Sequence, residues 1–526
     1  MTKFQVLPII AGLCLTHLAY ADVNINVITD DNPANLKSIP NLQSLRSVPT
    51  KTSYQAPYVH DLKNRYKVRT LFVESRDLPI VDIQLTFNAG AARDTEVENG
   101  LYGVANMAAQ LMAEGTEKYN AQQIAAAFEQ VGAQFRMSAY RDMFIVRLRV
   151  LSDPKKLEPA LAMMMEVLNN SSFKNSSINL MLNNTQVGQK QLNENPNRLM
   201  SILFSRELYG NHPYAEPING TNGSIKRINP ILLKKFRDQF LVTQNMNIAI
   251  TGKMSSREAQ KLAERISGNL KQGEKAKPLP DPIIKEGFNI QHIPFNSSQA
   301  YVTMGHIATT RDDPDRLALE LANRMLGGSG FNSILMKELR VKRGYTYGAT
   351  SSFSFSQSPG VFSLNYSTRQ DQLVDSIRVA HKALVDFVQQ PIDKKLLEET
   401  KTGLLRSFPM NYSSNATINS QLGNLGFYNQ PSDYLNNYAN TIAKITAKDV
   451  QNAVKKHIHP DQLTLVIVSK DLDKDEIEQI LKENLNPSVK LKTPSTDDIP
   501  AINTPPQKPE EVVLPELVQP DELAPI

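Results

Sequence analysis

The chain has 526 residues, of which 41% are hydrophobic and 21% charged, and its formal net charge is +5. A globular chain of this length exceeds one ordinary hydrophobic core, so we expect two to four domains. The basic residues are not gathered into runs with interleaved aromatic residues, which argues against nucleic-acid binding.

Residues 1–21, MTKFQVLPIIAGLCLTHLAYA, have the pattern of a secretory signal peptide that is cleaved after Ala21. The apolar stretch is short for a membrane anchor, and Leu13 before Cys14 argues against a lipoprotein. Cleavage removes the single cysteine, so the mature chain has no disulfide, thiolate ligand or cysteine nucleophile. No later stretch is long and apolar enough to span a membrane. We expect an exported protein, periplasmic in a Gram-negative cell.

Composition predicts further boundaries along the chain. Pro and acidic residues dominate the C-terminal end, which is typical of a disordered tail, and the breaker-rich KQGEKAKPLPDP at 271–282 indicates a linker between two halves. The predicted segments are a signal peptide (1–21), an N-terminal extension (22–56), an N-domain (57–270), a linker (271–288), a C-domain (289–488) and the tail (489–526).

Strands and helices mix within the first half. Residues 81–88 alternate as a half-buried strand should, and 144–151 read as another strand. Residues 120–133 predict a helix with Asn120 as N-cap and Gly132 as its stop. A third helix surrounds LEPALAMMMEVL, whose methionines we expect to fill a core.

The helix predicted at 103–116 carries an unusual polar stripe. Asn106, Gln110 and Glu114 stand four residues apart on an otherwise apolar surface. A mostly buried helix with one wet edge explains this pattern. An i, i+4 amide pair also has the spacing at which two side chains can hold one metal ion.

Two distant segments share one pattern. Residues 224–254 and 441–471 align without a gap, and each has a Ser or Thr cap, an amphipathic helix, a turn and a strand. Isoleucines match, for example Ile250 with Ile467. The pattern indicates an internal duplication, and we expect in each half an α+β sandwich with helices covering one face of a sheet.

The order of motifs resembles a known family. NAGAARDTEVENG, the helix at 103–116 with its terminal GT, YGNHPYAEPINGT (209–221) and LGGSGFNSILMKELRVKRGYTYGA (326–349) follow one another as in the pitrilysin/insulinase family of zinc peptidases, which includes the mitochondrial processing peptidase. The resemblance covers roughly Val68 to Asp471. It implies two homologous tandem α+β domains that form a clam-like chamber around a peptide.

Active members of that family carry H-x-x-E-H on the helix that ends at GT. Alignment on Gly115-Thr116 places Asn106 and Gln110 at the two histidines and Ala109 at the glutamate that acts as general base. The third ligand falls near Gln186, and no Asp or Glu occurs between Glu166 and Glu194. Amides are weak zinc ligands beside imidazole, so we expect no metal in this chain.

The remaining histidines offer no obvious substitute. His457 and His459 lie where the repeat predicts the end of a helix, and a protonated histidine there favours the helix dipole. A metal role for this pair is the minor alternative. We expect His212, in the NHPYAEPINGT loop, to be structural.

The second half keeps a different part of the family pattern. ELRVKRGYTY matches the segment whose Arg and Tyr point into the active site, here Arg340 and Tyr347. The resemblance implies that they hold the substrate backbone and stabilise the oxyanion. A surface Arg and a core Tyr are the alternative. Gly327, Gly328, Ser329 and Gly330 are expected to let a substrate backbone approach.

In two-subunit members of this family one chain bears zinc and the other keeps only the Arg/Tyr pair. The sequence therefore predicts a zinc-free subunit that acts on a peptide substrate with a homologous zinc-bearing partner. One alternative is a peptide-binding or scaffolding module without an enzyme partner. Another is an autonomous zinc metalloendopeptidase.

Overall fold

The computed structural model describes residues 56–192, 194–328 and 330–491, with side chains left out for 184–192. The predicted signal peptide, most of the N-terminal extension and most of the Pro-rich tail lie outside the described residues. Both sheets of the protein belong to one compact unit.

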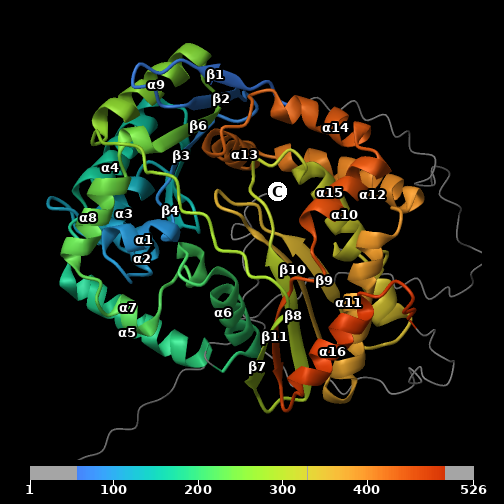
Figure 1. The fold of residues 1–526 in the computed structure, drawn as a ribbon. Helices are drawn as coiled ribbons and strands as arrows, with labels where there is room; N and C mark the ends of the chain where they lie inside the picture. The colour runs from blue at the N-terminus through green and yellow to red at the C-terminus, as the bar shows by residue number, and fades with distance from the viewer. Residues whose placement is uncertain (1–55, 193, 329, 492–526) are drawn as a thin grey trace, which may run out of the picture. The chain divides into compact units, whose positions relative to one another are not determined.

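The first sheet is built by the first half of the chain (Figure 1). Its strands, in spatial order, are β1 (His60–Leu62), β2 (Thr70–Glu74), β6 (Met246–Gly252), β3 (Ile80–Phe87), β5 (Phe144–Leu151) and β4 (Gln134–Ala139). Only β2 and β6 pair in parallel among these described strands. The strands predicted at 81–88 and 144–151 are therefore confirmed.

The second sheet repeats this topology. Its strands, in spatial order, are β7 (Asn289–Pro294), β11 (Thr464–Ser469), β8 (Gln299–Ile307), β10 (Val361–Arg369) and β9 (Ala349–Phe353), with β7 and β11 parallel. Ile250 of β6 lies opposite Ile83, and its repeat partner Ile467 of β11 lies opposite Val302. The duplication and the predicted α+β class with two homologous tandem halves are confirmed. The domain boundaries stay a prediction.

Helices surround both sheets. The first half contributes α1 (Asp94–Val97), α2 (Val104–Leu111), α3 (Ala121–Glu129), α4 (Pro154–Asn170), α5 (Asn175–Leu192), α6 (Pro196–Tyr209), α7 (Asn222–Ile225), α8 (Pro230–Phe240) and α9 (Ser256–Asn269). The second half contributes α10 (Arg316–Gly327), α11 (Leu373–Gln389), α12 (Lys394–Ser407), α13 (Asn415–Phe427), α14 (Tyr434–Lys444), α15 (Ala447–His457) and α16 (Lys474–Asn484). No helix in the described ranges has the length and apolar character needed to cross a bilayer.

Local signals fixed several helix ends. Asn120 caps α3 in a capping box with Gln123, as its side-chain chemistry predicts. The repeat helices α8 and α15 begin after Asn229 and Thr446, which are their real caps. The expected Ser or Thr cap is therefore confirmed in the second segment, whereas an asparagine caps the helix of the first. The methionines of α4 are buried in the core, as expected.

Each half sends one helix onto the other half's sheet. Helix α6 packs on β8 and β11, and α13 packs on β2, β3 and β6 (Figure 1). The α6 contact joins Met200, Phe204 and Leu208 to Ile307, Val466 and Val468. The expectation that helices cover one face of each sheet is therefore wrong for this pair of contacts, because the second face is also occupied.

Strand β3 shows the effect of the packing of α13 on the first sheet. Its polar residues Asp82, Gln84 and Thr86 are buried although their alternation predicted a solvated face. The backbone of α13 lies against them, since a Cβ on Gly423 would stand 2.0 Å from Gln84 Nε2. Arg149 pairs with Asp82 at 2.8 Å, which satisfies the buried carboxylate.

Candidate functional site

Helix α2 carries Asn106, Ala109 and Gln110, which the resemblance aligns with the family's zinc motif. The carboxylate of Asp94 holds its first turn, accepting hydrogen bonds from the backbone N–H groups of Gly103 (2.6 Å), Val104 (3.1 Å) and Ala105 (2.9 Å). Burial raises the pKa of Asp94 to about 7, against the lowering effect of those hydrogen bonds. Gly103 has a φ of +94°, a backbone conformation that glycine adopts at low cost. The helix is thus firmly anchored although its zinc motif is absent.

The two amides on α2 bond to each other. Gln110 Nε2 donates a hydrogen bond to Asn106 Oδ1 at 3.3 Å. Ala109, which lies between the two amides in the sequence, is buried. A side-chain amide is a weak zinc ligand, and a methyl group cannot accept a proton. The three positions therefore do not fit a catalytic zinc ion.

The third ligand position gives the same answer. Gln186 lies on α5, and its side chain is outside the described residues. The sequence of α5 contains no Asp or Glu. No carboxylate of this helix can complete a zinc site.

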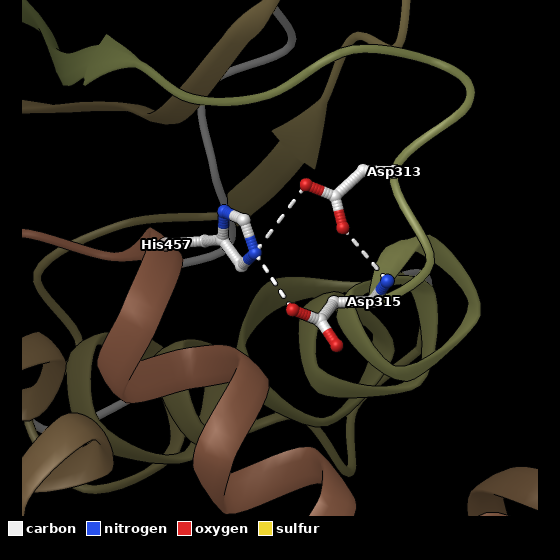
Figure 2. A group of neighbouring side chains, drawn as sticks. All are labelled: Asp313, Asp315 and His457. Carbon is white, nitrogen blue, oxygen red and sulfur yellow. Dashed lines mark hydrogen bonds and ion pairs between the residues drawn. The ribbon is translucent and has the colours of Figure 1, made fainter.

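One cluster within the described residues has the geometry of a metal site. Ligand atoms of Asp313, Asp315 and His457 lie within 4.8 Å of one another (Figure 2). His457 ends α15, as the repeat predicts, with Nε2 3.0 Å from Asp315 and 3.5 Å from Asp313. Lys456 Nζ lies 2.8 Å from Asp315, and their hydrogen bond lowers the pKa of that carboxyl. Thr309 donates to Asp313 at 2.6 Å. Both carboxylates already have protein partners. The cluster therefore connects the end of α15 to the start of α10 through an ion pair and hydrogen bonds.

Arg340 and Tyr347 lie on the segment around a π-helical turn, Met336–Val341, where Arg340 is half-buried and Tyr347 is exposed. Tyr347 is 74% exposed, so it is not a core tyrosine, and its hydroxyl has no hydrogen bond to the described residues. Arg340 Nη1 donates to the Tyr347 carbonyl at 2.6 Å, and its guanidinium lies 4.7 Å from the centre of the Phe331 ring. Sequence reasoning missed Phe331, although its place beside the glycine segment was a usable signal.

The glycine segment is shaped by internal packing. A Cβ on Gly327 would stand 2.4 Å from Ser351 N, and one on Gly328 would stand 2.5 Å from Arg324 Cα. Gly330 has a φ of +119° and open space around its Cα, while Ser329 lies outside the described residues. Gly327 thus allows the end of α10 to lie close to β9, and Gly328 allows the following turn to lie close to α10. This internal packing explains both glycines without a bound substrate.

A cavity of about 660 Å³ lies beside these glycines. Both halves line it: Arg141 and Asp142 follow β4, whereas Arg311, Arg324 and Tyr428 come from the second half. Gly327 and Gly328 belong to its wall. Asn106, Gln110, Arg340 and Tyr347 do not line it, so among the predicted site residues with described side chains only the two glycines reach this cavity.

His212 is structural, as expected. Its Nδ1 accepts from Tyr214 N at 3.1 Å and its Nε2 donates to the Pro280 carbonyl at 2.9 Å. Tyr214 donates to Asp142, which also accepts from Gln357 N at 2.9 Å. The loop therefore fastens the predicted linker and the second half to the first.

Comparisons with known proteins identify the family of the chain. The chain matches the family model for insulinase (peptidase family M16) over residues 69–222 and that for the peptidase M16 inactive domain over residues 227–404. It is 24% identical over 417 residues to a Helicobacter pylori protein named non-peptidase homolog YmxG, covering 78% of this chain and 94% of that protein. It is 25% identical over 400 residues to an uncharacterized zinc protease of Rickettsia bellii, covering 74% and 92%.

A solved structure extends the match. The crystal structure of a peptidase M16 inactive domain from Pseudomonas fluorescens aligns with a TM-score of 0.74 and 34% identity, over 79% of this chain and 98% of that one. The family-model matches fall on both halves of the chain. The chain belongs to the insulinase family, peptidase family M16, and resembles its non-peptidase members.

Proposed function

We propose that this chain is a zinc-free, non-catalytic subunit of an exported, periplasmic heterodimeric zinc metallopeptidase. Its partner is a homologous chain that bears H-x-x-E-H and the zinc ion. This chain supplies Arg340 and Tyr347 to the site where the partner cleaves peptides.

One contrast carries the proposal. The zinc positions hold two amides bonded to each other and a buried methyl group. The Arg/Tyr segment instead keeps both residues, with a tyrosine hydroxyl that is exposed and has no hydrogen bond to the described residues. The name of the Helicobacter pylori relative, a non-peptidase homolog, supports the same view.

The two side chains have complementary work. The Tyr347 hydroxyl donates a hydrogen bond to the oxyanion that forms on the attacked carbonyl, where such donors matter most. The Arg340 guanidinium holds substrate carbonyls with its fork of N–H donors. Its hydrogen bond to the Tyr347 carbonyl and its contact with Phe331 hold the pair together.

A second candidate is a peptide-binding or scaffolding module without an enzyme partner. The cavity of about 660 Å³ favours it, because this space lies within one chain. That function makes Arg340 and Tyr347 dispensable. An autonomous zinc metalloendopeptidase would need ligands that α2 and α5 do not offer.

Co-purification separates these functions. We expect the chain isolated from its native periplasm to carry a homologous chain with intact H-x-x-E-H, identified by mass spectrometry. The reconstituted pair should cleave peptides and lose activity with a zinc chelator, while this chain alone should be inactive. Chelator-sensitive cleavage by this chain alone contradicts the proposal, and isolation without any homologue favours the scaffold.

A further inference from the structure

The wall of the cavity carries more guanidinium groups than carboxylates. Arg141, Arg147, Arg311 and Arg324 line it, against Asp142 and Glu320. Both carboxylates have partners elsewhere: Asp142 accepts from Tyr214 and Gln357, and Glu320 pairs with Arg316, which does not line the cavity. The cavity therefore has an excess of positive charge near its surface.

Arg324 has no ion-pair partner among the described residues, because the nearby Glu320 pairs with Arg316. It lies four residues after Glu320 on α10, a spacing at which the two could pair. Glu320 instead turns to Arg316, whose other nitrogen donates to the Tyr434 hydroxyl. The guanidinium of Arg324 makes no hydrogen bond or ion pair with any residue that the structure describes.

Arg311 is in a similar position. Its guanidinium lies 5.0 Å from the centre of the Tyr428 ring, which holds it without using its N–H groups. No carboxylate or carbonyl among the described residues accepts a hydrogen bond from that guanidinium. Burial is the main cause that lowers the pKa of Arg311, the charge of Arg316 adds to the lowering, and Tyr428 and Glu320 oppose it.

The other two arginines are already engaged. Arg141 donates to the carbonyls of Tyr214 (2.9 Å) and Glu216 (2.8 Å), and Arg147 donates to Gln84 at 3.1 Å. Open N–H donors in the cavity thus belong to Arg311 and Arg324. A carboxylate matches the planar fork of a guanidinium and would satisfy these donors.

We propose that Arg311 and Arg324 form a carboxylate-binding subsite that takes an acidic side chain of a peptide lying in the cavity. The peptide nature of the ligand rests on the proposed function, whereas the carboxylate rests on the two arginines. The subsite needs no partner chain. It selects acidic peptides, which the family resemblance does not predict.

Two sources can supply the carboxylate. One is an external peptide. The other is the chain's own C-terminal segment, since residues 494–526 contain seven acidic residues and one lysine. Thirty-five residues follow Leu491, and an extended segment of that length spans roughly 115 Å. A tethered acidic segment would compete with external peptides through its high local concentration.

The test measures binding to the full chain by fluorescence anisotropy. The probe is a fluorescein-labelled peptide with the sequence of residues 509–519, PEEVVLPELVQ. We expect Arg311→Gln and Arg324→Gln each to weaken binding by roughly tenfold or more, because each removes charged hydrogen bonds. A probe with its three glutamates replaced by glutamine should bind the unaltered chain as weakly. Added NaCl should weaken binding of the acidic probe only.

Controls keep the result interpretable. Arg257→Gln removes an exposed arginine of α9 and should leave binding unchanged. Arg311→Lys keeps the charge and should give an intermediate loss, which covers the case in which Arg311→Gln fails to fold. Equal affinity for the glutamate and glutamine probes, or unchanged binding by both Gln variants, overturns the proposal. Displacement by inorganic phosphate as effective as by unlabelled peptide also overturns it.

A full chain with Glu510→Gln, Glu511→Gln and Glu516→Gln distinguishes the two sources. Tighter binding of the external probe assigns the subsite to the chain's own segment, and unchanged binding assigns it to external peptides. Both results support a carboxylate subsite. All measurements use this chain alone, so they stand whether or not a zinc-bearing partner is found.

Discussion

Gln110 donates a hydrogen bond to Asn106 one turn earlier on α2, at 3.3 Å. The two amides that the resemblance aligns with the family's zinc-binding histidines are thus partners of each other. They form a local polar contact at the helix surface. This relationship leads directly to predictions about metal content.

Purified chain should contain well under one zinc ion per molecule after dialysis. Because no bound ion then contributes to folding, EDTA should leave the Tm unchanged. Metal analysis by mass spectrometry and thermal unfolding check both statements. Zinc retained at one ion per chain would contradict the assignment of α2 as a degenerate motif.

Restoring the motif alone should not restore activity. The triple change Asn106→His, Ala109→Glu and Gln110→His rebuilds H-x-x-E-H but leaves no carboxylate on α5. We expect no peptidase activity and weak zinc binding. Adding Gln186→Glu is the matched variant and should raise zinc affinity. High activity of the triple variant by itself would show that another group supplies the third ligand.

Tyr347→Phe tests the Arg/Tyr pair in the reconstituted complex. The hydroxyl is exposed and has no hydrogen bond to the described residues, so the Tm and subunit pairing should not change. We expect kcat to fall by roughly 10²-fold, the usual effect of losing one oxyanion donor. Arg340→Ala should also raise KM, because it holds the substrate before reaction.

Val341→Ala, at an exposed position of the same segment, is the control for Tyr347→Phe and should leave kcat unchanged. An intact complex of the Tyr347→Phe variant with full activity would reduce this chain to a scaffold.

Gly328→Val should lower the free energy of unfolding, whatever its effect on peptide binding. Its Cβ would stand 2.5 Å from Arg324 Cα, so the turn after α10 must shift, at a cost of roughly 1–3 kcal/mol. Gly403→Ala is the contrasting variant: it lies within α12 with nothing within 4 Å, and should stabilise by up to about 1 kcal/mol. Urea unfolding measures both. A Gly328→Val variant as stable as the parent would contradict the packing explanation.

The contribution of His306 to the free energy of unfolding should fall as the pH drops from about 6.5 to 4, while Asp94, with its raised pKa, acts in the opposite direction. Burial lowers the pKa of His306 to about 4, so the folded chain resists a proton that the unfolded chain accepts. His459 and His457 add to this lowering and Asp461 opposes it. The ring also accepts a hydrogen bond from His459 N at 3.1 Å, which protonation would break. The contribution of His306 to stability is therefore fully present above pH 6.5. It decreases by about 3 kcal/mol as the pH falls to 4.

Urea unfolding between pH 7.5 and pH 4.5 checks this prediction in the parent and in His306→Gln. The variant should lose part of the pH dependence and keep the rest, because burial also lowers the pKa of His381 to about 4. An identical pH profile in both proteins would show that His306 does not contribute.

Local patterns predicted much of the fold and little of the cavity. Residues close in sequence determine the cap at Asn120, the methionine core and the repeat helices. Their side-chain chemistry is therefore enough to predict these features. The burial of Gln84 depends on Gly423, more than three hundred residues later, and no local pattern reports it. Arg311 and Arg324 were missed for the same reason: only the folded chain shows which arginines have partners.

The exchange of α6 and α13 between the two sheets gives one chain the arrangement of a twofold dimer. Two equivalent helices that each cross to the other sheet are what a pair of identical, unfused half-length chains would form around a twofold axis. In this chain the corresponding contacts lie within one protein. A change in α6 or α13 therefore acts on the sheet of the other half as well as on its own half.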